Sequence, residues 1–322
     1  MRFIAKNWGL LLGLIVFILV VGFGTSSLLQ QRPQRPDTVS GTIAFRTNRD
    51  GNFEIYSWAV NDRKADRITI NDGEDANPSY NNDGSLLAFE SWSNEQPDII
   101  VADAVNGVGN PITTDLAWDT EPDWSPDSAR LVFVSDRGET ESLYLVNRDS
   151  TGLIRVTGDE GRDTSPAWSP DGTTIVFVSN RGGTNGIYSL AVNSCVPPAE
   201  GSPPLTPQTC TITPIIVDGA DNTYPDWSPD GERIAFASTR DGGQAIYALR
   251  LRNNRVDQLT QGPLDSHPAY SPEGGRIVYT DGASGNDELF VYDIVRRETE
   301  QITNNRESDG HGVWRPAPPP AE

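Results

Sequence analysis

The chain has 322 residues, and its 45 aspartates and glutamates outnumber its 25 lysines and arginines, which gives a formal net charge of −20. Such a charge opposes phosphate backbones and anionic membrane surfaces at long range, so the composition argues against a nucleic-acid partner. Once a short N-terminal segment is set aside, about 280 residues remain, which is enough to bury a large core as a single domain.

The first predicted element is a membrane-insertion signal at residues 8–24. This run carries no charge, Arg2 and Lys6 precede it, and no acidic residue follows before Asp37. A positive flank before an apolar run is typical of a segment whose N-terminal end stays in the cytoplasm. The run is long for the core of a signal peptide, and no Ala-x-Ala cleavage site follows it.

We therefore expect a cytoplasmic stub at 1–7, an uncleaved transmembrane signal-anchor helix at 8–24 and a flexible stalk at 25–38. This organisation predicts a single-pass protein of the cell membrane whose remaining residues lie on the extracytoplasmic side. Cleavage near the small residues Gly22 and Gly24 is the alternative.

A repeated phrase occupies residues 39–316. Trp-Ser-Pro-Asp stands at 124–127, 168–171 and 227–230, and altered copies begin at Tyr80, Tyr270 and Trp314. The aromatic residues that open the copies, here called anchors, are spaced by 44, 44, 59, 43 and 44 residues. This is the period of a four-stranded propeller blade. We therefore predict an all-β fold, a six-bladed β-propeller of four-stranded antiparallel blades, followed by a Pro-rich tail at 317–322.

Each repeat contains the same strand signals. The anchor should end the innermost strand, because Ser-Pro-Asp-Gly is turn chemistry and not a catalytic motif. An apolar triplet such as 175–177 predicts the second strand, a segment such as 186–188 the third, and segments that end in Arg67-Ile68-Thr69 or Gln301-Ile302-Thr303 the fourth. The first triplet has no anchor before it and the last anchor has no triplet after it. One blade should therefore combine strands from both ends of the chain, which closes the ring.

The two cysteines, Cys195 and Cys210, both lie in the one interval that is stretched to 59 residues. Two cysteines in an insertion of an exported domain predict a hairpin closed by a disulfide. Two unpaired thiols in a flexible loop are the alternative.

Residues 225–247, which read PDWSPDGERIAFASTRDGGQAIY, resemble the repeat of the TolB-like propeller family, and the resemblance covers nearly all of 39–316. It implies six blades around a channel and a docking platform for envelope proteins. Members of that family carry an α/β domain before the propeller and are exported in soluble form, whereas here the stalk at 25–38 precedes the ring and a tether is expected. We therefore carry over the fold and protein interaction, but not membership of a Tol–Pal machine.

Similar repeats occur in prolyl-oligopeptidase-type peptidases and in oligogalacturonide lyases. The peptidases depend on a hydrolase domain with a Gly-x-Ser-x-Gly elbow, which this sequence lacks. The lyases hold a metal through several histidines, and this sequence has two.

An acidic residue or its amide recurs five positions before each anchor, and we expect these side chains to ring one mouth of the channel. Carboxylates in a ring could hold Ca²⁺, which takes six to eight oxygen ligands. Alternatively each caps a turn or pairs with a loop arginine, for which Arg49, Arg137, Arg181 and Arg240 are candidates. The six positions are Asp75, Asp119, Asp163, Asn222, Asp265 and Asp309.

Two further pairs of residues are candidates for a site. His267 and His311 each lie three residues before an anchor, and with Asp265 and Asp309 they could hold a transition metal. A shared repeat position explains their proximity equally well. Trp92 and Trp118 should both lie at the channel mouth, where exposed tryptophans could bind a partner or could pack against each other.

The function that these patterns favour is a noncatalytic docking module. It would be a monomeric propeller that needs no cofactor, with Ca²⁺ as a candidate ion at the channel mouth, and it would present the mouth to an envelope or extracellular protein. The alternative is a metal-dependent carbohydrate-active enzyme, such as an oligogalacturonide-lyase-like lyase. An enzyme should lose turnover in His267→Ala, whereas a docking module should show no turnover and lose a co-purifying protein.

Overall fold

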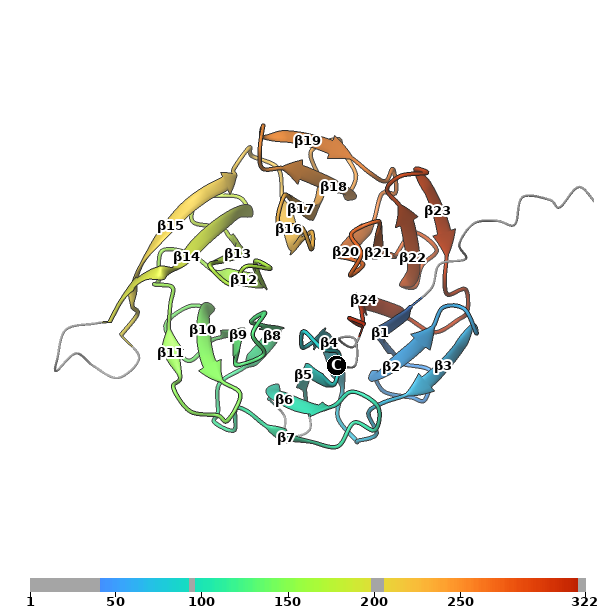
Figure 1. Ribbon diagram of the computed structural model, residues 1–322, viewed down its shortest axis with the longest axis horizontal. Helices are drawn as coiled ribbons and strands as arrows, with labels where there is room; N and C mark the ends of the chain where they lie inside the picture. Colours follow the sequence, from blue (N-terminus) through green and yellow to red (C-terminus); the bar gives the residue numbers. More distant parts are fainter. Residues whose placement is uncertain (1–40, 93–95, 198–205, 318–322) are drawn as a thin grey trace, which may run out of the picture. The chain divides into compact units, whose positions relative to one another are not determined.

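The computed structural model describes residues 41–92, 96–197 and 206–317. They form six four-stranded antiparallel sheets around a central axis (Figure 1), which confirms the predicted propeller. The stub, the signal-anchor helix and the stalk lie outside the described residues, as does most of the Pro-rich tail. Within the described ranges, no helix has the length and hydropathy that a membrane crossing needs.

Each blade has an inner strand that faces the channel and an outer strand that faces solvent. The inner strands are β4 (Asp75–Tyr80), β8 (Asp119–Trp124), β12 (Asp163–Trp168), β16 (Asn222–Trp227), β20 (Asp265–Tyr270) and β24 (Asp309–Trp314). The second strands are β1 (Thr42–Thr47), β5 (Leu86–Ser91), β9 (Arg130–Ser135), β13 (Thr174–Ser179), β17 (Arg233–Ser238) and β21 (Arg276–Asp281).

The third strands are β2 (Glu54–Ala59), β6 (Asp98–Asp103), β10 (Ser142–Asn147), β14 (Gly186–Val196), β18 (Ala245–Arg250) and β22 (Glu288–Asp293). The outer strands are β3 (Lys64–Arg67), β7 (Gly109–Pro111), β11 (Ile154–Arg155), β15 (Thr209–Ile216), β19 (Arg255–Gln258) and β23 (Glu298–Gln301).

The first blade combines both ends of the ring, as predicted. β24 pairs with β1 in antiparallel register, with Ile43 opposite Trp314 and Thr47 opposite Asp309. The backbone N–H of Arg315 then donates to the carbonyl of Thr42 at 2.8 Å. The last strand of the chain therefore fills the innermost place in the blade that the first strand begins.

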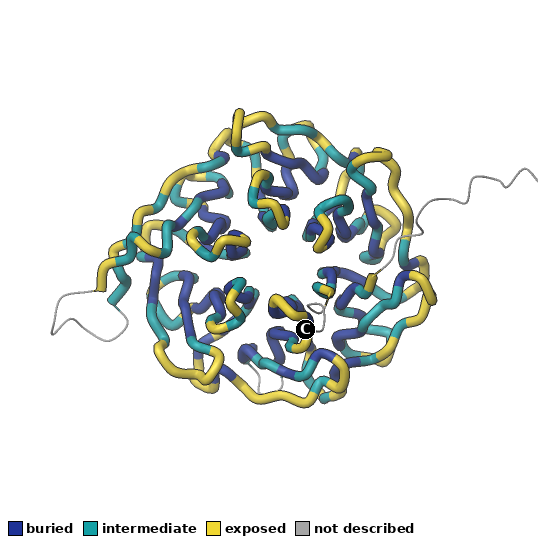
Figure 2. The backbone as a smooth tube through the Cα atoms, viewed as in Figure 1, coloured by how far each residue is buried: buried dark blue, intermediate teal, exposed yellow. Residues whose placement is uncertain are grey.

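The core lies between blades. Ile175, Val176 and Phe177 have no exposed surface, which explains why the second strands are apolar at both parities. The cluster around Trp168 joins side chains of β9 and β10 to side chains of β13 and β14 of the next blade. Figure 2 shows the same pattern, with burial concentrated on the second strands and exposure in the loops and on the outer strands.

The outer strands end earlier than the sequence predicts. The Ile-Thr pair that was assigned to the fourth strand lies just beyond it, for example at Ile68 and Thr69 after β3. The reason is that the threonine hydroxyl, and not a backbone carbonyl, accepts the N–H of the third strand, as Thr69 Oγ1 does from Ile55 at 2.9 Å. The same bond recurs from Leu143 to Thr157.

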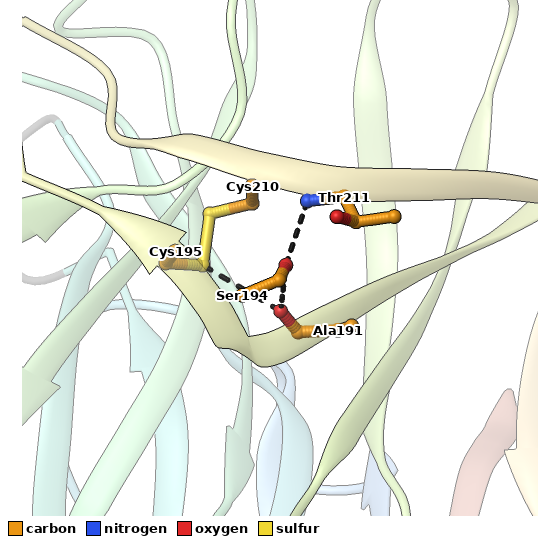
Figure 3. Close-up of a disulfide and its surroundings, with 5 residues drawn as sticks. All are labelled: Ala191, Ser194, Cys195, Cys210 and Thr211. Carbon is orange, nitrogen blue, oxygen red and sulfur yellow. Dashed lines mark hydrogen bonds between the residues drawn. A yellow bond between two sulfur atoms is a disulfide. The ribbon is translucent and has the colours of Figure 1, made fainter.

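The long interval between anchors forms an arm that extends from the fourth blade. β14 and β15 continue past the ring, and Cys195 and Cys210 join them in a disulfide (Figure 3), which confirms the predicted pairing. Ser194 Oγ also accepts a hydrogen bond of 2.7 Å from the N–H of Thr211. The arm is therefore cross-linked covalently and by hydrogen bonding at one place.

Candidate functional site: the channel and its mouth

Antiparallel strands give the ring two chemically different faces. The Asp face carries the loops that join each outer strand to the next inner strand, together with the loops between second and third strands. The turn face carries the Ser-Pro-Asp turns between inner and second strands. Both β1 and the segment after β24 meet the turn face, because β1 begins there and β24 ends there.

The six side chains five positions before the anchors lie at the Asp face but do not line an open mouth. Five of them are fully buried and Asp265 is 1% exposed. Four pair with the arginines that the sequence named as the alternative. The bonds are Arg49 Nη2 to Asp309 Oδ1 at 3.0 Å, Arg137 Nη2 to Asp119 Oδ1 at 2.6 Å, Arg181 Nη2 to Asp163 Oδ2 at 2.8 Å, and Arg240 Nη2 to Asn222 Oδ1 at 3.0 Å.

Each of these arginines also stacks on two aromatic side chains of its blade. Arg181, for example, has its guanidinium carbon 5.5 Å from the centroid of Phe177 and 5.3 Å from that of Tyr188. Cation–π contact and the carboxylate therefore hold the guanidinium from two sides. The sequence analysis identified the arginines but not the two aromatic side chains on which each of them stacks. The Phe and Tyr that recur in the second and third strands are the sequence signal for that contact.

Asp75 and Asp265 are the ring positions without an arginine partner among the described residues. Burial raises the pKa of each carboxyl to about 6. Asn71 Nδ2 donates to Asp75 Oδ2 at 2.7 Å, and the N–H of Gly262 donates to Asp265 Oδ2 at 3.1 Å. The Oδ1 atom of each is buried without a hydrogen-bond partner.

In the described part of the chain, no three His, Cys, Asp or Glu side chains converge in a way that could hold a metal ion. Calcium binding by the ring of aspartates stays a prediction, and the arginine pairs already supply a cation at four positions.

The residues that do face the channel lie three positions before the anchors, where each inner strand bulges. All six adopt positive φ, between 49° and 53°, although none is glycine. They line a cavity of about 150 Å³. The six are Asn77, Glu121, Ser165, Tyr224, His267 and His311. Sequence reasoning flagged only the two histidines; the signal for the rest was the proline that follows five of the six.

His267 stacks between Tyr224 and His311. The ring centroids of Tyr224 and His267 are 3.6 Å apart, and those of His267 and His311 are 3.8 Å apart with planes inclined by 20°. Nitrogen lone pairs lie in the ring planes, so two nearly parallel stacked imidazoles do not converge on one metal ion. The predicted metal site at this pair stays untested, and it would require one ring to rotate.

Burial also keeps this stack uncharged. Desolvation, with a smaller effect from Arg46, lowers the pKa of His267 to about 3. Desolvation lowers the pKa of His311 well below its usual range, helped by His267 and Arg46. Carboxyl groups line the same cavity. Desolvation raises the pKa of Glu121 to about 7, of Asp123 to about 6 and of Asp226 to about 7, which favours the protonated, uncharged form of each.

Trp92 and Trp118 lie together at the Asp face, as the sequence predicts. Their ring centroids are 5.1 Å apart in an edge-to-face arrangement, and Trp118 remains 49% exposed. The two predicted roles, packing against each other and binding a partner, are therefore compatible, because the ring of Trp118 packs on Trp92 and still faces solvent.

These features define the class of the protein as a six-bladed propeller with a buried Asp–Arg ring and a narrow, uncharged stack in its channel. A family model described as the TolB beta propeller domain matches residues 117–199 and 208–318. The chain belongs to this family.

Similarity to individual proteins is more limited. A Tol-Pal system protein TolB of Desulfosudis oleivorans is 27% identical over 84 residues, which cover 26% of this chain and 19% of that protein. The chain therefore matches less than a fifth of the length of this curated relative. The crystal structure of TolB from Acinetobacter baumannii superposes with a TM-score of 0.74 at 21% identity, over 86% of this chain and 67% of that one.

An oligogalacturonate lyase of Vibrio parahaemolyticus superposes less closely. Its TM-score is 0.52 at 15% identity, over 75% of this chain and 72% of that chain. Likeness at this level of identity shows the propeller fold alone.

Proposed function

We propose that this protein is an exported, membrane-tethered propeller that acts as a noncatalytic docking module and presents its Asp face to an envelope or extracellular protein. The main support for the proposal is the location of the exposed apolar side chains of the protein. Five of the nine large exposed hydrophobic residues in the described ranges are in the loops that lead into inner strands, and all five are at the Asp face. They are Ile70, Leu116, Trp118, Val217 and Leu264.

The charges of the same loops define the kind of partner. Seven acidic residues are exposed there, against two exposed arginines, Arg162 and Arg306. A partner with basic and apolar side chains fits this surface best, because opposite potentials speed association and select the partner. The acidic residues are Asp72, Glu74, Asp115, Asp159, Glu160, Asp218 and Asp221.

A capture experiment tests the docking face. The full-length protein is expressed in its host, cross-linked and purified, and its co-purifying proteins are compared with those of Trp118→Ala. We expect the partner to be lost without a change in melting temperature, because Trp118 is half-exposed. Val295→Ala is the matched control, since Val295 is 86% exposed on the turn face. Equal loss in both variants, or a fall in the melting temperature of Trp118→Ala, would contradict the proposal.

The tether is supported by the uncharged run at 8–24 and its basic flank. Alkaline extraction of membranes should leave the full-length protein in the membrane fraction, and its N-terminal sequence should begin before residue 8. Release into the soluble fraction with a new N-terminus near Gly24 would identify a cleaved signal.

Calcium is a separate part of the proposal and is not required for docking. It is supported at Asp75 and Asp265, whose buried Oδ1 atoms have no hydrogen-bond partner. A rise in melting temperature with Ca²⁺ but not with Mg²⁺ would support a site, because a ligand bound only by the folded state stabilises it. No change at millimolar Ca²⁺ would assign the ring to turn capping and arginine pairing.

The lyase alternative would place its chemistry in the channel. The observation in its favour is that an uncharged His267 faces a cavity that also contains Glu121. Turnover of acidic oligosaccharides by the purified protein, lost in His267→Ala, would support an enzyme. Absence of turnover together with partner capture supports the docking module.

A further inference from the structure

The outer strand of the fourth blade differs from the other five. β15 has eight residues, Thr-Cys-Thr-Ile-Thr-Pro-Ile-Ile, and carries no charge. The other outer strands have two to four residues, and each contains a charged residue or a proline. Short, charged or Pro-containing edges are how sheets avoid pairing with other chains. β15 also contains Pro214, but its length and lack of charge leave the part of the edge before Pro214 able to pair.

β15 is also fixed in place by bonds within the arm itself. The disulfide joins it to β14 at Cys210, and Ser194 Oγ accepts from the N–H of Thr211 (Figure 3). Ile212 packs against the core between the third and fourth blades, whereas Thr209, Thr211 and Thr213 are exposed. Little conformational entropy would therefore be lost on binding.

The hydrogen bonds in the arm show which backbone groups face outward. The N–H of Thr211 points toward β14, so by strand alternation the backbone groups of Cys210 and Ile212 point away from it. Gln208 follows the same alternation, and its N–H already donates to the carbonyl of Arg155 in β11 at 2.9 Å. Pro214 has no N–H. Among the described residues, the part of the edge left without a partner is therefore centred on Ile212.

We propose that β15 pairs with β15 of a second copy of this chain, antiparallel and across a two-fold axis at Ile212. The sequence around that residue is symmetric, with Thr211 on one side and Thr213 on the other. In this register Ile212 exchanges both hydrogen bonds with its own copy, and the N–H of Cys210 donates to the carbonyl of the other chain's Pro214. Thr211 faces the other chain's Thr213, a favourable cross-strand pair.

This inference goes beyond the docking function, since β15 lies on the rim and not on the Asp face (Figure 1). The sequence analysis predicts a monomer, but closure of the ring leaves the outer edge of each blade open. Such an edge contact is small, so we expect a weak dimer. Its affinity should rise with salt, because β15 is uncharged while the two chains repel through net charges of −20 each.

Sedimentation equilibrium of the full-length protein in a mild detergent tests the dimer. The wild type should approach the dimer mass as its concentration rises, and Thr213→Glu should weaken association about tenfold or more by placing charge beside the axis. Thr299→Glu makes the same change on β23 and should behave as wild type. A wild-type monomer at every concentration, or equal behaviour of the two variants, would overturn the proposal.

A cross-linking experiment tests the register independently of affinity. Thr211→Cys and Thr213→Cys chains are mixed and mildly oxidised; a disulfide between the two different variants is expected, because those positions face each other across the axis. Neither variant alone should cross-link to the same extent. Cross-linking of Thr211→Cys by itself, or none in the mixture, would overturn the two-fold pairing at Ile212.

Discussion

Arg49 and Asp309 are separated by 260 residues in the sequence, yet Arg49 Nη2 donates to Asp309 Oδ1 at 3.0 Å. The Asp309 side chain is fully buried, and the arginine side chain is 24% exposed. The pair links the loop after β1 to the start of β24, so it forms only when the ring is closed. In a blade built from consecutive strands, the corresponding pair is close in the sequence: Arg181 and Asp163 are 18 residues apart.

Replacing Arg49 by methionine should therefore destabilise the closed ring. The change leaves a buried carboxylate without its cation, which typically costs about 3–5 kcal/mol. Arg240→Met is the matched control, because its ring partner is Asn222 and no fully buried charge is left behind. Urea unfolding should show a clearly larger loss for Arg49→Met. Equal losses would mean that aromatic stacking, and not the ion pair, determines the contribution of these arginines.

Removal of β24 should open the ring. A chain that ends at Ser308 lacks the inner strand of the first blade and exposes the apolar edge of β1, so Ile43 loses its partner Trp314. We expect the cooperative thermal transition of the whole propeller to be lost, not only that of one blade. A chain that ends at Ala317 keeps β24 and should melt like the full-length protein. A truncated chain that melts normally would show that closure is dispensable.

The ring and its closure could be read from the sequence because both rest on local signals that repeat. The anchor, the turn and the apolar triplet each have their own physical reason at every copy, and Trp314 without a triplet implied pairing with Ile43. The channel could not be read in this way. Glu121 and Tyr224 face it because a bulge turns one residue of each inner strand. The proline that follows five of the six positions marks the place in the sequence, but it does not by itself indicate a bulge.

The sequence also did not indicate that the side chains of these aspartates are buried. Their repeat position indicated one end of the channel, but whether a side chain at Asp163 faces water or an arginine depends on the packing of Phe177 and Tyr188 beside it. The length of β15 was hidden for another reason. The extra residues indicated a disulfide hairpin, but not that both of its strands continue the sheet.

The contribution of Asp265 to the stability of the ring should fall as the pH rises from about 4 to 7, whereas the lowered pKa of buried His267 makes its contribution rise over the same range. The carboxyl pKa of Asp265 is about 6 in the folded protein, above its ordinary value of 3.8, so the folded state holds the proton more tightly. Its contribution is therefore fully present below the ordinary value and is lost as the pH rises through about 6. Asp75, at about 6, and Asp226, at about 7, change in the same direction.

Asp265→Asn should flatten this pH dependence. Relative to wild type, the variant should be more stable at pH 8 than at pH 4. The difference should reach up to about 3 kcal/mol for a shift of about two pKa units. Asp309→Asn is the control and should be destabilised at pH 8, because Arg49 then lacks its carboxylate. Chemical denaturation at both pH values distinguishes the two. An unchanged slope in Asp265→Asn would show that this carboxyl is not among the groups that titrate.

Removal of the disulfide should loosen the arm without opening the ring. Cys195 and Cys210 are separated by 15 residues, and a cross-link over a loop of that size stabilises by about 3 kcal/mol in the chain-entropy model. In Cys195→Ser/Cys210→Ser, hydrogen exchange should quicken in β14 and β15 and stay unchanged in the strands of the first, second and sixth blades, because the clusters between those blades contain no residue of the arm. Addition of a reductant should change the wild type in the same way and leave the variant unaffected. Faster exchange in all six blades would instead make the arm part of the cooperative core.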